Sequence, residues 1–514
     1  MAARWGALAA AAVWMLMIGA AHAARWTASA SAGATETYNH YSGPGQPNDE
    51  AVTSLTAALN FNGEGARVKL HGTLSATEVL YTGNSQSNSF APGASVTANV
   101  EAVEHFFFVD ATANVTQTYA SPFGPQPANI TTPTVNRYTS ETYSVSPYIK
   151  GVLGSSVTYL VRDDSVWTTA QNYGDSSIKP PATYSNSLDA SLSSATGGPN
   201  GWSAQYTRQY YDPGTGPGEY VLQLARGIDS YALDPQFQVS ARIGYEKDEF
   251  PAESAIGGTT EGSFYGAGAH WRPTERTDLN GWWEHHYYGS AYSWALTHRL
   301  PNIALSANFT RGLNSYPQLA LLIPAGVPVA QFLDAAFTTR IPDPVERAAA
   351  VAQFLAQSGL PPTLVSPLNV YAATVTLQST ATFSAVWVGL RNSLGFAVYR
   401  SESESVINQS ALPEAFAFGA NNIQTGAGVS YSHRVSALTN FVANLSYSTT
   451  KPNGGDQAVA SVSTHNYNAS AALTTSFSPK TTGSVGISYF TFDTANTSGR
   501  QSTLSLYATV SHTF

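Results

Sequence analysis

Cysteine is absent from the 514 residues of this chain. The chain can therefore form no disulfide framework, hold no metal through thiolates and carry no lipid on a cysteine. Charged residues are also scarce, at 11% of the sequence, and the formal net charge is −9. No basic stripe is present that would release counterions from phosphates, which excludes a general role in nucleic-acid binding.

Long apolar runs are missing beyond residue 23. The one such run lies at the start, where Arg4 precedes an apolar stretch and Ala21-His22-Ala23 forms a small-x-small cleavage site. This pattern predicts an export signal over residues 1–23 and a mature chain from Ala24. A membrane anchor is the alternative, but the run is short for a span and no stop-transfer pattern follows it. An exported chain without cysteine is typical of the periplasm or outer membrane of a Gram-negative bacterium.

Aromatic residues, in contrast, make up 12% of the chain, which together with the low charge argues against disorder. Apolar and polar residues alternate with a period of two, most clearly over residues 237–246, 303–310 and 501–514. Such alternation predicts strands with a different solvent on each face. We expect the apolar set to face lipid and the polar set, which includes Arg242 and Glu246, to face a lumen.

The predicted strands are joined alternately by long loops and short turns along the whole chain, with one short turn predicted near residues 227–235. This asymmetry is typical of outer-membrane barrels, and counting the connections gives about 22 strands in one transmembrane antiparallel β-barrel over residues 24–514. Only a closed sheet satisfies every backbone group in lipid. A soluble β-sandwich array or propeller is the alternative, which the export signal and the loop asymmetry disfavour.

Residues 313–368 interrupt the strand pattern. Asp343 is a favourable N-cap, Pro344 fits the first helical position and Glu346 can complete a capping box, so we expect a helix here. The count of connections places this insertion on the extracellular side. Two arrangements remain open: a constriction or lid folded into the lumen, or a helical cap packed on neighbouring loops outside it. Strand patterns begin almost at the cleavage site, so we expect no N-terminal plug, which argues against a siderophore-type energy-coupled transporter.

Catalytic and cofactor motifs are absent, because the sequence contains no nucleophile elbow, HExxH, phosphate loop or paired nucleotide fingerprint. We therefore expect neither an enzyme nor a bound cofactor. The densest polar cluster is Glu284-His285-His286, in which Glu284 and His286 share one face of a strand. Three interpretations remain open: ordinary strand residues near an aromatic girdle, a metal pair completed from elsewhere, or a lumen site offering stacking faces and donors to a sugar. The candidate lumen-lining residues are Arg242, Glu246, Trp282, Glu284, His286, Tyr288 and Arg299.

The C-terminus resembles the closing strand of bacterial outer-membrane barrels, whose terminal aromatic residue is read by the barrel-assembly machinery. Phe514 is the expected insertion signal, although His512 departs from the aromatic or aliphatic residue usual at its position. The resemblance implies this machinery, outer-membrane lipid and lipopolysaccharide as partners.

Several short stretches carry a resemblance to known proteins: FFFVDA at 106–111, ANVTQ at 113–117, SPY at 146–148, GYE at 244–246, YGAG at 265–268, WRPTERT at 271–277, YG at 288–289, the helix start at 343–346 and GLRN at 389–392. In these stretches the chain resembles one family, the uncharacterised outer-membrane proteins associated with the PEP-CTERM/exosortase protein-sorting system. The resemblance implies a setting beside exopolysaccharide biosynthesis and export, with exopolysaccharide as a partner. It transfers no catalytic residue. The chain carries no PEP-CTERM tail, so it would belong to the machinery rather than to the sorted proteins.

These observations together predict a passive or gated conduit for a glycan or small polar solutes. The alternative is a non-conducting scaffold or adhesin whose long loops bind surface polysaccharide or a partner. Conduction by the isolated barrel would favour the first, and binding that depends on the loops without conduction would favour the second.

Overall fold

The computed structural model describes residues 25–514 except 84, 177–178, 195–197, 257–258, 322–327, 339, 359–360, 414–416, 455–461 and 496–499. The predicted export signal lies outside the described residues. The strands are β1 (Arg25–Ser42), β2 (Glu50–Glu64), β3 (Val68–Tyr81), β4 (Ser89–Val103), β5 (Phe107–Tyr119), β6 (Arg137–Leu153), β7 (Val157–Asn172), β8 (Thr183–Ser194), β9 (Asn200–Asp212), β10 (Tyr220–Asp234), β11 (Phe237–Glu249), β12 (Glu261–Thr274), β13 (Thr277–His286), β14 (Gly289–Leu300), β15 (Ile303–Asn314), β16 (Thr376–Val388), β17 (Asn392–Ser405), β18 (Asn422–Arg434), β19 (Thr439–Pro452), β20 (Thr464–Ser478), β21 (Thr481–Thr494) and β22 (Gln501–Thr513). The helices are α2 (Tyr316–Ala320), α3 (Val329–Phe337), α4 (Pro344–Ser358), η2 (Gln409–Ala411) and α5 (Ala417–Ala420).

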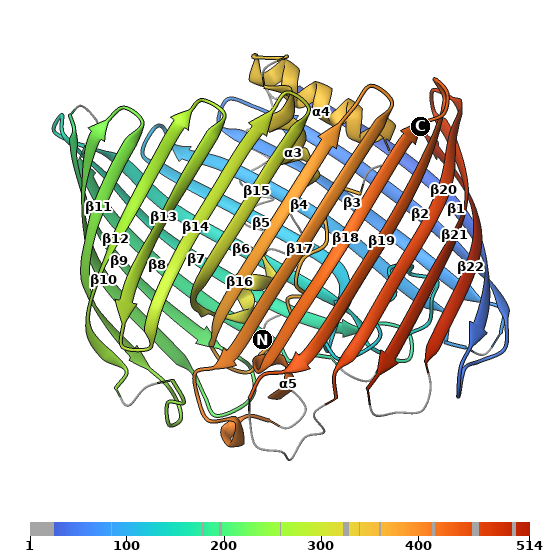
Figure 1. The fold of residues 1–514 in the computed structure, drawn as a ribbon, viewed down its shortest axis with the longest axis horizontal. Helices are drawn as coiled ribbons and strands as arrows, with labels where there is room; N and C mark the ends of the chain where they lie inside the picture. The colour runs from blue at the N-terminus through green and yellow to red at the C-terminus, as the bar shows by residue number, and fades with distance from the viewer. Residues whose placement is uncertain are drawn as a thin grey trace.

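Each strand pairs antiparallel with the next one along the chain, and β1 pairs with β22, so the 22-stranded sheet closes on itself (Figure 1). The predicted fold, an antiparallel transmembrane barrel of about 22 strands with one helical insertion, is confirmed. At the closure, the Thr35 and Thr509 hydroxyls hydrogen bond at 2.8 Å, and the Phe514 backbone N–H donates to the Ala30 carbonyl at 2.8 Å. The Phe514 ring itself is exposed on the outer surface.

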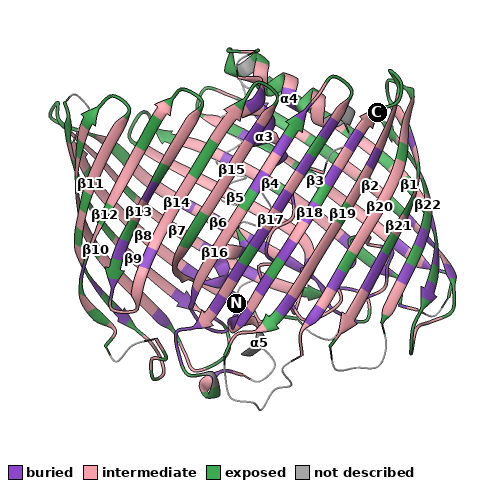
Figure 2. Cartoon of the chain, in the orientation of Figure 1, coloured by how far each residue is buried: buried purple, intermediate pink, exposed green. Residues whose placement is uncertain are grey.

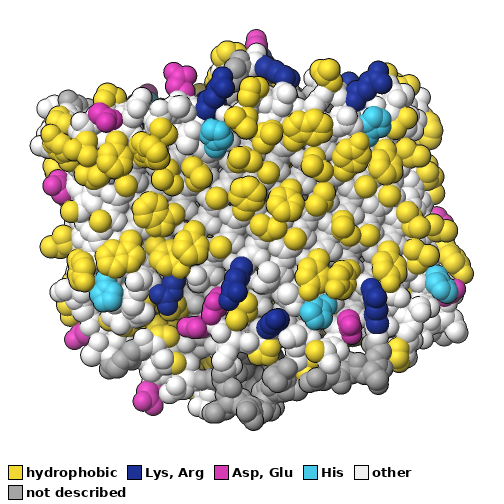
Figure 3. Space-filling view, viewed as in Figure 1, with side chains coloured by type: hydrophobic (Ala, Val, Ile, Leu, Met, Phe, Trp, Pro, Cys, Tyr) yellow, Lys and Arg dark blue, Asp and Glu magenta, His cyan; other side chains and the backbone are white. Residues whose placement is uncertain are grey.

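Hydrophobic side chains cover the outer wall. Figure 3 shows them across the middle of one face, with most charged and histidine side chains nearer its upper and lower edges. On β22, Leu504, Leu506 and Val510 are exposed, whereas Thr503 and Ser505 on the alternate face are buried. An apolar outside around a polar inside is the arrangement of a barrel in the outer membrane. None of the described helices is long and apolar enough to cross a membrane.

The two rims differ. Long loops, together with the short connection from β13 to β14, lie at one end, and the other short turns lie at the opposite end with the C-terminus (lower and upper edges of Figure 1). Outer-membrane barrels keep their short turns on the periplasmic side. The short turn predicted near residues 227–235 begins later than expected, because β10 continues to Asp234 and the chain turns only at residues 235–236. Gly227 lies inside the strand and does not end it.

The insertion between β15 and β16, residues 315–375, runs through the inside of the barrel. It begins at the long-loop rim, where the Tyr316 and Tyr138 hydroxyls hydrogen bond at 2.9 Å. Its helices α3 and α4 lie at the opposite rim (Figure 1), where Arg340 Nη2 donates to Asn302 Oδ1 of a short turn at 2.8 Å. The insertion therefore passes through the full height of the lumen. Arg347 Nε on α4 is paired with Asp334 of α3 at 2.7 Å, which joins the two helices.

Helix α4 begins as its sequence predicts, because the Asp343 carboxylate accepts a hydrogen bond from the Glu346 backbone N–H at 2.9 Å. Helix α3 packs on the inner wall with Phe332 and Leu333 buried, and the returning segment adds Leu364. Inward-facing residues of β15 to β17 complete this apolar cluster: Ala304, Val386, Val388 and Ala397. Figure 2 shows the result on β17 and β18, where buried residues alternate with more exposed ones along the strand.

A second segment folds inward from the long-loop rim. In the loop between β5 and β6, the Gln126 and Ala128 backbone N–H groups donate to Asn466 and Asn468 of β20, each at 2.9 Å. Because β20 is distant from β5 and β6 in the sheet, this loop crosses the mouth of the barrel. A cavity of about 390 Å³ remains between it and residues 363–369 of the insertion.

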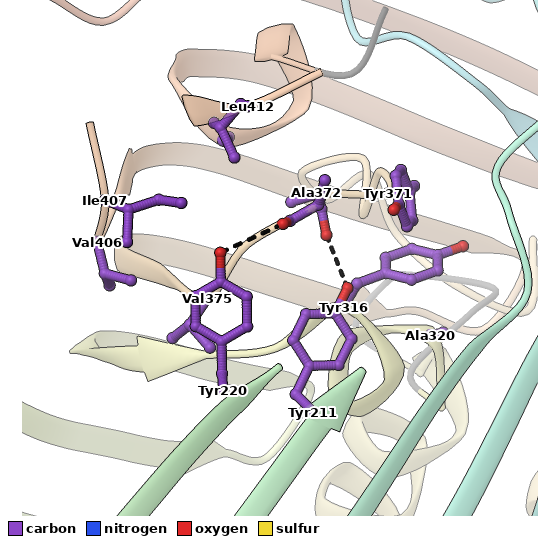
Figure 4. Close-up of a cluster of buried hydrophobic side chains, with 12 residues drawn as sticks. Tyr211, Tyr220, Tyr316, Ala320, Tyr371, Ala372, Val375, Val406, Ile407 and Leu412 are labelled. Carbon is purple, nitrogen blue, oxygen red and sulfur yellow. Dashed lines mark hydrogen bonds between the residues drawn. The ribbon is translucent and has the colours of Figure 1, made fainter. Parts of the chain in front are cut away.

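The end of the insertion is anchored at the long-loop rim by a cluster of tyrosines (Figure 4). Tyr211 donates to the Ala372 carbonyl at 2.7 Å, and Tyr220 donates to the Ala373 carbonyl at 3.4 Å. Tyr371 in turn donates to the Pro213 carbonyl at 2.7 Å. These bonds join the segment before β16 to β9, β10 and their connecting loop, and so they hold both ends of the insertion at this rim.

Candidate functional site

A polar cluster lies on the inner wall of β10 to β13. The strand register places Gly244 opposite Arg226 and Gly266 opposite both Arg242 and Glu284. A side chain at Gly266 would meet Glu284 Cγ at 2.6 Å, and one at Gly244 would meet the Phe264 ring. Because both glycines leave this space empty, the two arginines reach Glu284 across the intervening strands.

Glu284 is the centre of the cluster and is fully buried, at 0% exposure. Its Oε2 accepts from Arg226 Nη2 at 2.8 Å, and its Oε1 lies 3.3 Å from Arg242 Nη1. His286 lies between two carboxylates, with Nε2 at 3.1 Å from Glu284 and Nδ1 at 2.8 Å from Glu246. A buried carboxylate is maintained only when such partners replace its hydration, so these groups form one coupled network.

Aromatic rings enclose this network. The His286 ring stacks between Phe264, at 4.5 Å between centroids, and Tyr288, at 4.9 Å. The guanidinium groups of Arg226 and Arg242 both lie over the Trp282 ring, at 5.7 and 5.0 Å. Cation–π contacts and stacking restrict these side chains to few rotamers. The network is therefore a preorganised surface on the lumen wall.

The short connection from β13 to β14 closes the cluster at the end nearer the long loops. Tyr287 donates its hydroxyl to Asp248 at 2.7 Å, and its backbone N–H donates to Glu246 at 3.3 Å. Burial, and next the nearby Asp248 carboxylate, raise the pKa of Tyr287 above its ordinary value, and burial also raises the pKa of Tyr288. Both side chains therefore remain neutral phenols that can donate hydrogen bonds.

A cavity of about 470 Å³ opens in front of the cluster. Its walls include Gln209, Arg226, Trp282, Glu284, Tyr288 and Asn314. This set offers charged and neutral donors and an aromatic surface, which suits a hydroxylated or partly anionic solute. Among the described residues, no group of histidine and carboxylate side chains has the arrangement of a metal site.

The structure brings together most of the residues that the sequence singled out. Arg242, Glu246, Trp282, Glu284 and His286 share one patch of the inner wall, and Tyr288 stacks on it from the adjoining turn. Arg299 does not join them. It lies near the short-turn rim, where its Nη2 donates to the Glu275 carbonyl at 2.6 Å, and it lines a different cavity.

The neighbouring positions face the other way. Trp283 is exposed on the outer wall beside His285 and Tyr265, which is where an aromatic girdle lies. The girdle interpretation therefore applies to these alternate positions, while Glu284 and His286 face the lumen.

Sequence reasoning missed Arg226, Phe264 and Asp248. Arg226 carries no clear sequence signal, because the predicted turn begins at Gly227 and the neighbours of Arg226 on its own face, Leu224 and Ile228, are apolar. Phe264 carried no signal of its own, because an aromatic residue on a strand fits either face of this barrel.

No protein-family profile matches the sequence, and no curated protein matches it. Solved structures of outer-membrane barrels are similar in shape. The FrpB iron transporter from Neisseria meningitidis (F5-1 variant, apoprotein form) is 8% identical over 94% of this chain and 81% of its own, with a TM-score of 0.45. The siderophore receptor PirA from Acinetobacter baumannii is 9% identical over 94% and 80%, with a TM-score of 0.41. OccAB4 from Acinetobacter baumannii is 8% identical over 95% and 98%, with a TM-score of 0.32. Similarity at this level concerns the barrel fold alone.

Proposed function

We propose that this chain is an outer-membrane conduit for small polar solutes and that residues 315–375 are its constriction. The observation that carries the proposal is the path of the insertion, which crosses the whole lumen and leaves cavities between itself and polar walls. Three such cavities measure about 740, 580 and 390 Å³, and a fourth, of about 470 Å³, is lined by the barrel strands beside the insertion. Cavities of this size hold small molecules rather than folded polymers. The proposal includes no catalytic step.

We extend the proposal to a place beside exopolysaccharide export and PEP-CTERM protein sorting, on the strength of the family resemblance in the sequence. In this setting the solute is a glycan fragment or a small sugar. The pairing of the Trp282 ring with hydrogen-bond donors at Arg226 and Gln209 on the cavity wall supports a sugar, because sugars present apolar ring faces and hydroxyls together. Export through the signal at residues 1–23 and insertion by the barrel-assembly machinery through Phe514 belong to the same proposal.

A non-conducting scaffold or adhesin is the second candidate, and one observation favours it. Both the insertion and the loop between β5 and β6 occupy the mouth of the barrel, where buried hydrogen bonds hold them. A barrel blocked in this way would present a folded surface to the outside without passing solute.

Conductance in planar bilayers separates the two candidates. The refolded mature chain, residues 24–514, is compared with a variant in which a short Gly/Ser linker replaces residues 317–373. If the insertion is the constriction, the variant conducts more than the parent chain. Equal, non-zero conductance would show that the insertion does not limit the pore. Silence from both barrels, each folded by its heat-modifiable gel mobility, would favour the scaffold.

A crosslink tests whether the insertion moves. A β-carbon built at Gly428 of β18 would lie 3.3 Å from the β-carbon of Val365, close to the roughly 3.5–4.5 Å that disulfides span. Because the chain has no cysteine, the Gly428→Cys/Val365→Cys variant can form only this disulfide within one chain. For a gated conduit we expect low conductance when it is oxidised and recovery on reduction, with each single variant insensitive to reductant. Identical conductance in both states would indicate a passive conduit with a fixed insertion.

A further inference from the structure

A second cavity, distinct from the cluster around Glu284, lies near the short-turn rim. It measures about 740 Å³ and is enclosed by the inner wall of β12 to β15, the adjoining turns and helix α3 of the insertion. Gln331, Phe332 and Ala335 of α3 form one side of it, and Phe332 is itself fixed in the apolar cluster behind the helix. The cavity is therefore bounded by the insertion on one side and the barrel wall on the other.

Guanidinium groups dominate the charged part of this cavity. Arg272, Arg276 and Arg299 line it, together with the carboxylates of Glu275 and Asp278. Asp278 is already occupied, because its Oδ2 accepts from Arg272 Nε at 2.7 Å and lies 3.2 Å from His270 Nε2. The other two arginines, Arg276 and Arg299, are then left with one carboxylate in the cavity, that of Glu275.

Neither of these two arginines is neutralised by an ion pair in the described part of the chain. Arg299 donates to the backbone carbonyl of Glu275 at 2.6 Å and not to its carboxylate. Arg276 lies in the turn between β12 and β13, at the edge of the cavity. Arg340 adds positive charge nearby, since it is held on Asn302 in the turn between β14 and β15. The side chains that line this cavity therefore carry more positive than negative charge, with three guanidinium groups against two carboxylates.

The uncharged lining supplies the rest of a recognition surface. The amides of Gln236, Asn308 and Gln331 and the hydroxyls of Thr277 and Ser306 are hydrogen-bonding groups that suit hydroxylated ligands. Phe332 contributes an apolar surface. Guanidinium groups bind carboxylates through two parallel hydrogen bonds, which a neutral sugar cannot match.

We infer that the cavity between α3 and the short-turn rim binds a small sugar acid, meaning a hydroxylated anion of one or two rings that carries carboxylates. The inference rests on the proposed conduit in naming its solute class, but the binding it describes can be measured without conduction. Arg276 and Arg299 hold the carboxylate, and the amides and Phe332 hold the ring. A solute that passes along this side of the insertion meets these groups near the periplasmic end.

Isothermal titration calorimetry on the refolded barrel in detergent tests the inference, with digalacturonate as the probe and a neutral disaccharide of the same size as its comparison. We expect digalacturonate to bind more tightly than the neutral sugar. Arg276→Gln and Arg299→Gln should each weaken this binding about tenfold, the effect of one charge-assisted hydrogen bond. Glu275→Gln should strengthen it, because it removes the competing carboxylate.

The control is Arg67→Gln, which removes an exposed arginine from the short turn between β2 and β3, outside the cavity. It should leave the affinity unchanged. Equal binding of the neutral disaccharide, or affinity that survives both cavity substitutions in barrels with parental heat-modifiable mobility, would overturn the inference. Binding of inorganic phosphate without binding of digalacturonate would also overturn it, since the site would then recognise a simple anion.

The outcomes also separate this site from the proposed conduit. Arginine-dependent binding by a barrel that never conducts would support the sugar-acid site and reject the conduit. Conduction without arginine-dependent binding would support the conduit and reject the site.

Discussion

Replacing Glu284 with glutamine should destabilise the barrel far more than the loss of an ordinary surface charge. The substitution keeps the shape of the side chain but removes the one negative charge that Arg226, Arg242 and His286 share. The two arginine side chains are only 17% and 15% exposed, so water compensates them poorly. The cluster would retain two buried guanidinium groups without their counter-charge.

The expected cost follows from this burial. Removing one member of a buried ion pair typically costs about 3–5 kcal/mol. Glutamine still accepts hydrogen bonds, and the arginines keep some contact with water, so we expect about 3 kcal/mol for Glu284→Gln. The matched control is Glu249→Gln on β11, whose carboxylate is 58% exposed and lies 3.5 Å from Lys247. An exposed pair of this kind contributes less than about 1 kcal/mol.

Reversible urea unfolding in lipid vesicles, followed by tryptophan fluorescence, measures the free energy of unfolding of both variants and of the parent chain. A double variant provides a second criterion, because Arg242→Gln added to Glu284→Gln removes one uncompensated cation. The double variant should therefore lose less stability than the sum of its two single variants. Equal losses for Glu284→Gln and Glu249→Gln, or strictly additive losses in the double variant, would refute the view that these groups form one coupled buried network.

Two further predictions concern the insertion. Tyr138→Phe removes the hydroxyl that bonds Tyr316 at 2.9 Å, so we expect a loss of about 1 kcal/mol and faster limited proteolysis of the insertion; unchanged cleavage would mean that this bond does not hold it. Gly428→Ala places a β-carbon 2.5 Å from Val365 Cγ1, which should displace the returning segment and raise conductance. Gly262→Ala is its control, because a β-carbon at that strand glycine meets nothing within 4 Å, and equal conductance in the two variants would contradict the reasoning.

The barrel could be predicted from the sequence because every strand has lipid on one face and a polar lumen on the other, and each strand's own residues reflect this. A strand between lipid and a polar lumen must alternate, and its connections must differ at the two rims, so both signals repeat along the chain. The same reasoning places the start of the turn after β10 too early, because Gly227 lies inside a strand that continues to Asp234. The path of the insertion left no such periodic signal. Its contact points on the wall, Gly395 and Gly428, are glycines whose missing side chains make room for Leu364 and Val365.

The candidate site could be predicted only in part, for a related reason. Alternation establishes that Trp282, Glu284 and His286 share the inner face, but it does not say which neighbouring strands lie beside them or at what height. Arg242 and Arg299 both face the lumen, yet the strand register places the first against Glu284 and the second near the opposite rim. Arg226 on β10 reaches Glu284 on β13 across the two strands between them. Only the pairing register of these neighbouring strands reveals that contact.

The strength of the insertion's contacts suggests where a gate would open. Helix α3 buries Val329, Phe332 and Leu333 against the wall, and at about 2 kcal/mol for each buried side chain its displacement would cost about 6 kcal/mol. A state that costs this much is populated only about once in 10⁴.

The returning segment is held less firmly. It buries Leu364 and exchanges two hydrogen bonds between the Leu368 backbone and the Gln424 amide, at 2.8 and 3.0 Å, which together amount to about 4 kcal/mol. Movement should therefore begin at residues 363–369, beside the cavity of about 390 Å³, while α3 stays on the wall. For this reason a disulfide between residues 365 and 428 should suppress opening, whereas an equivalent tether on α3 should leave conductance unchanged.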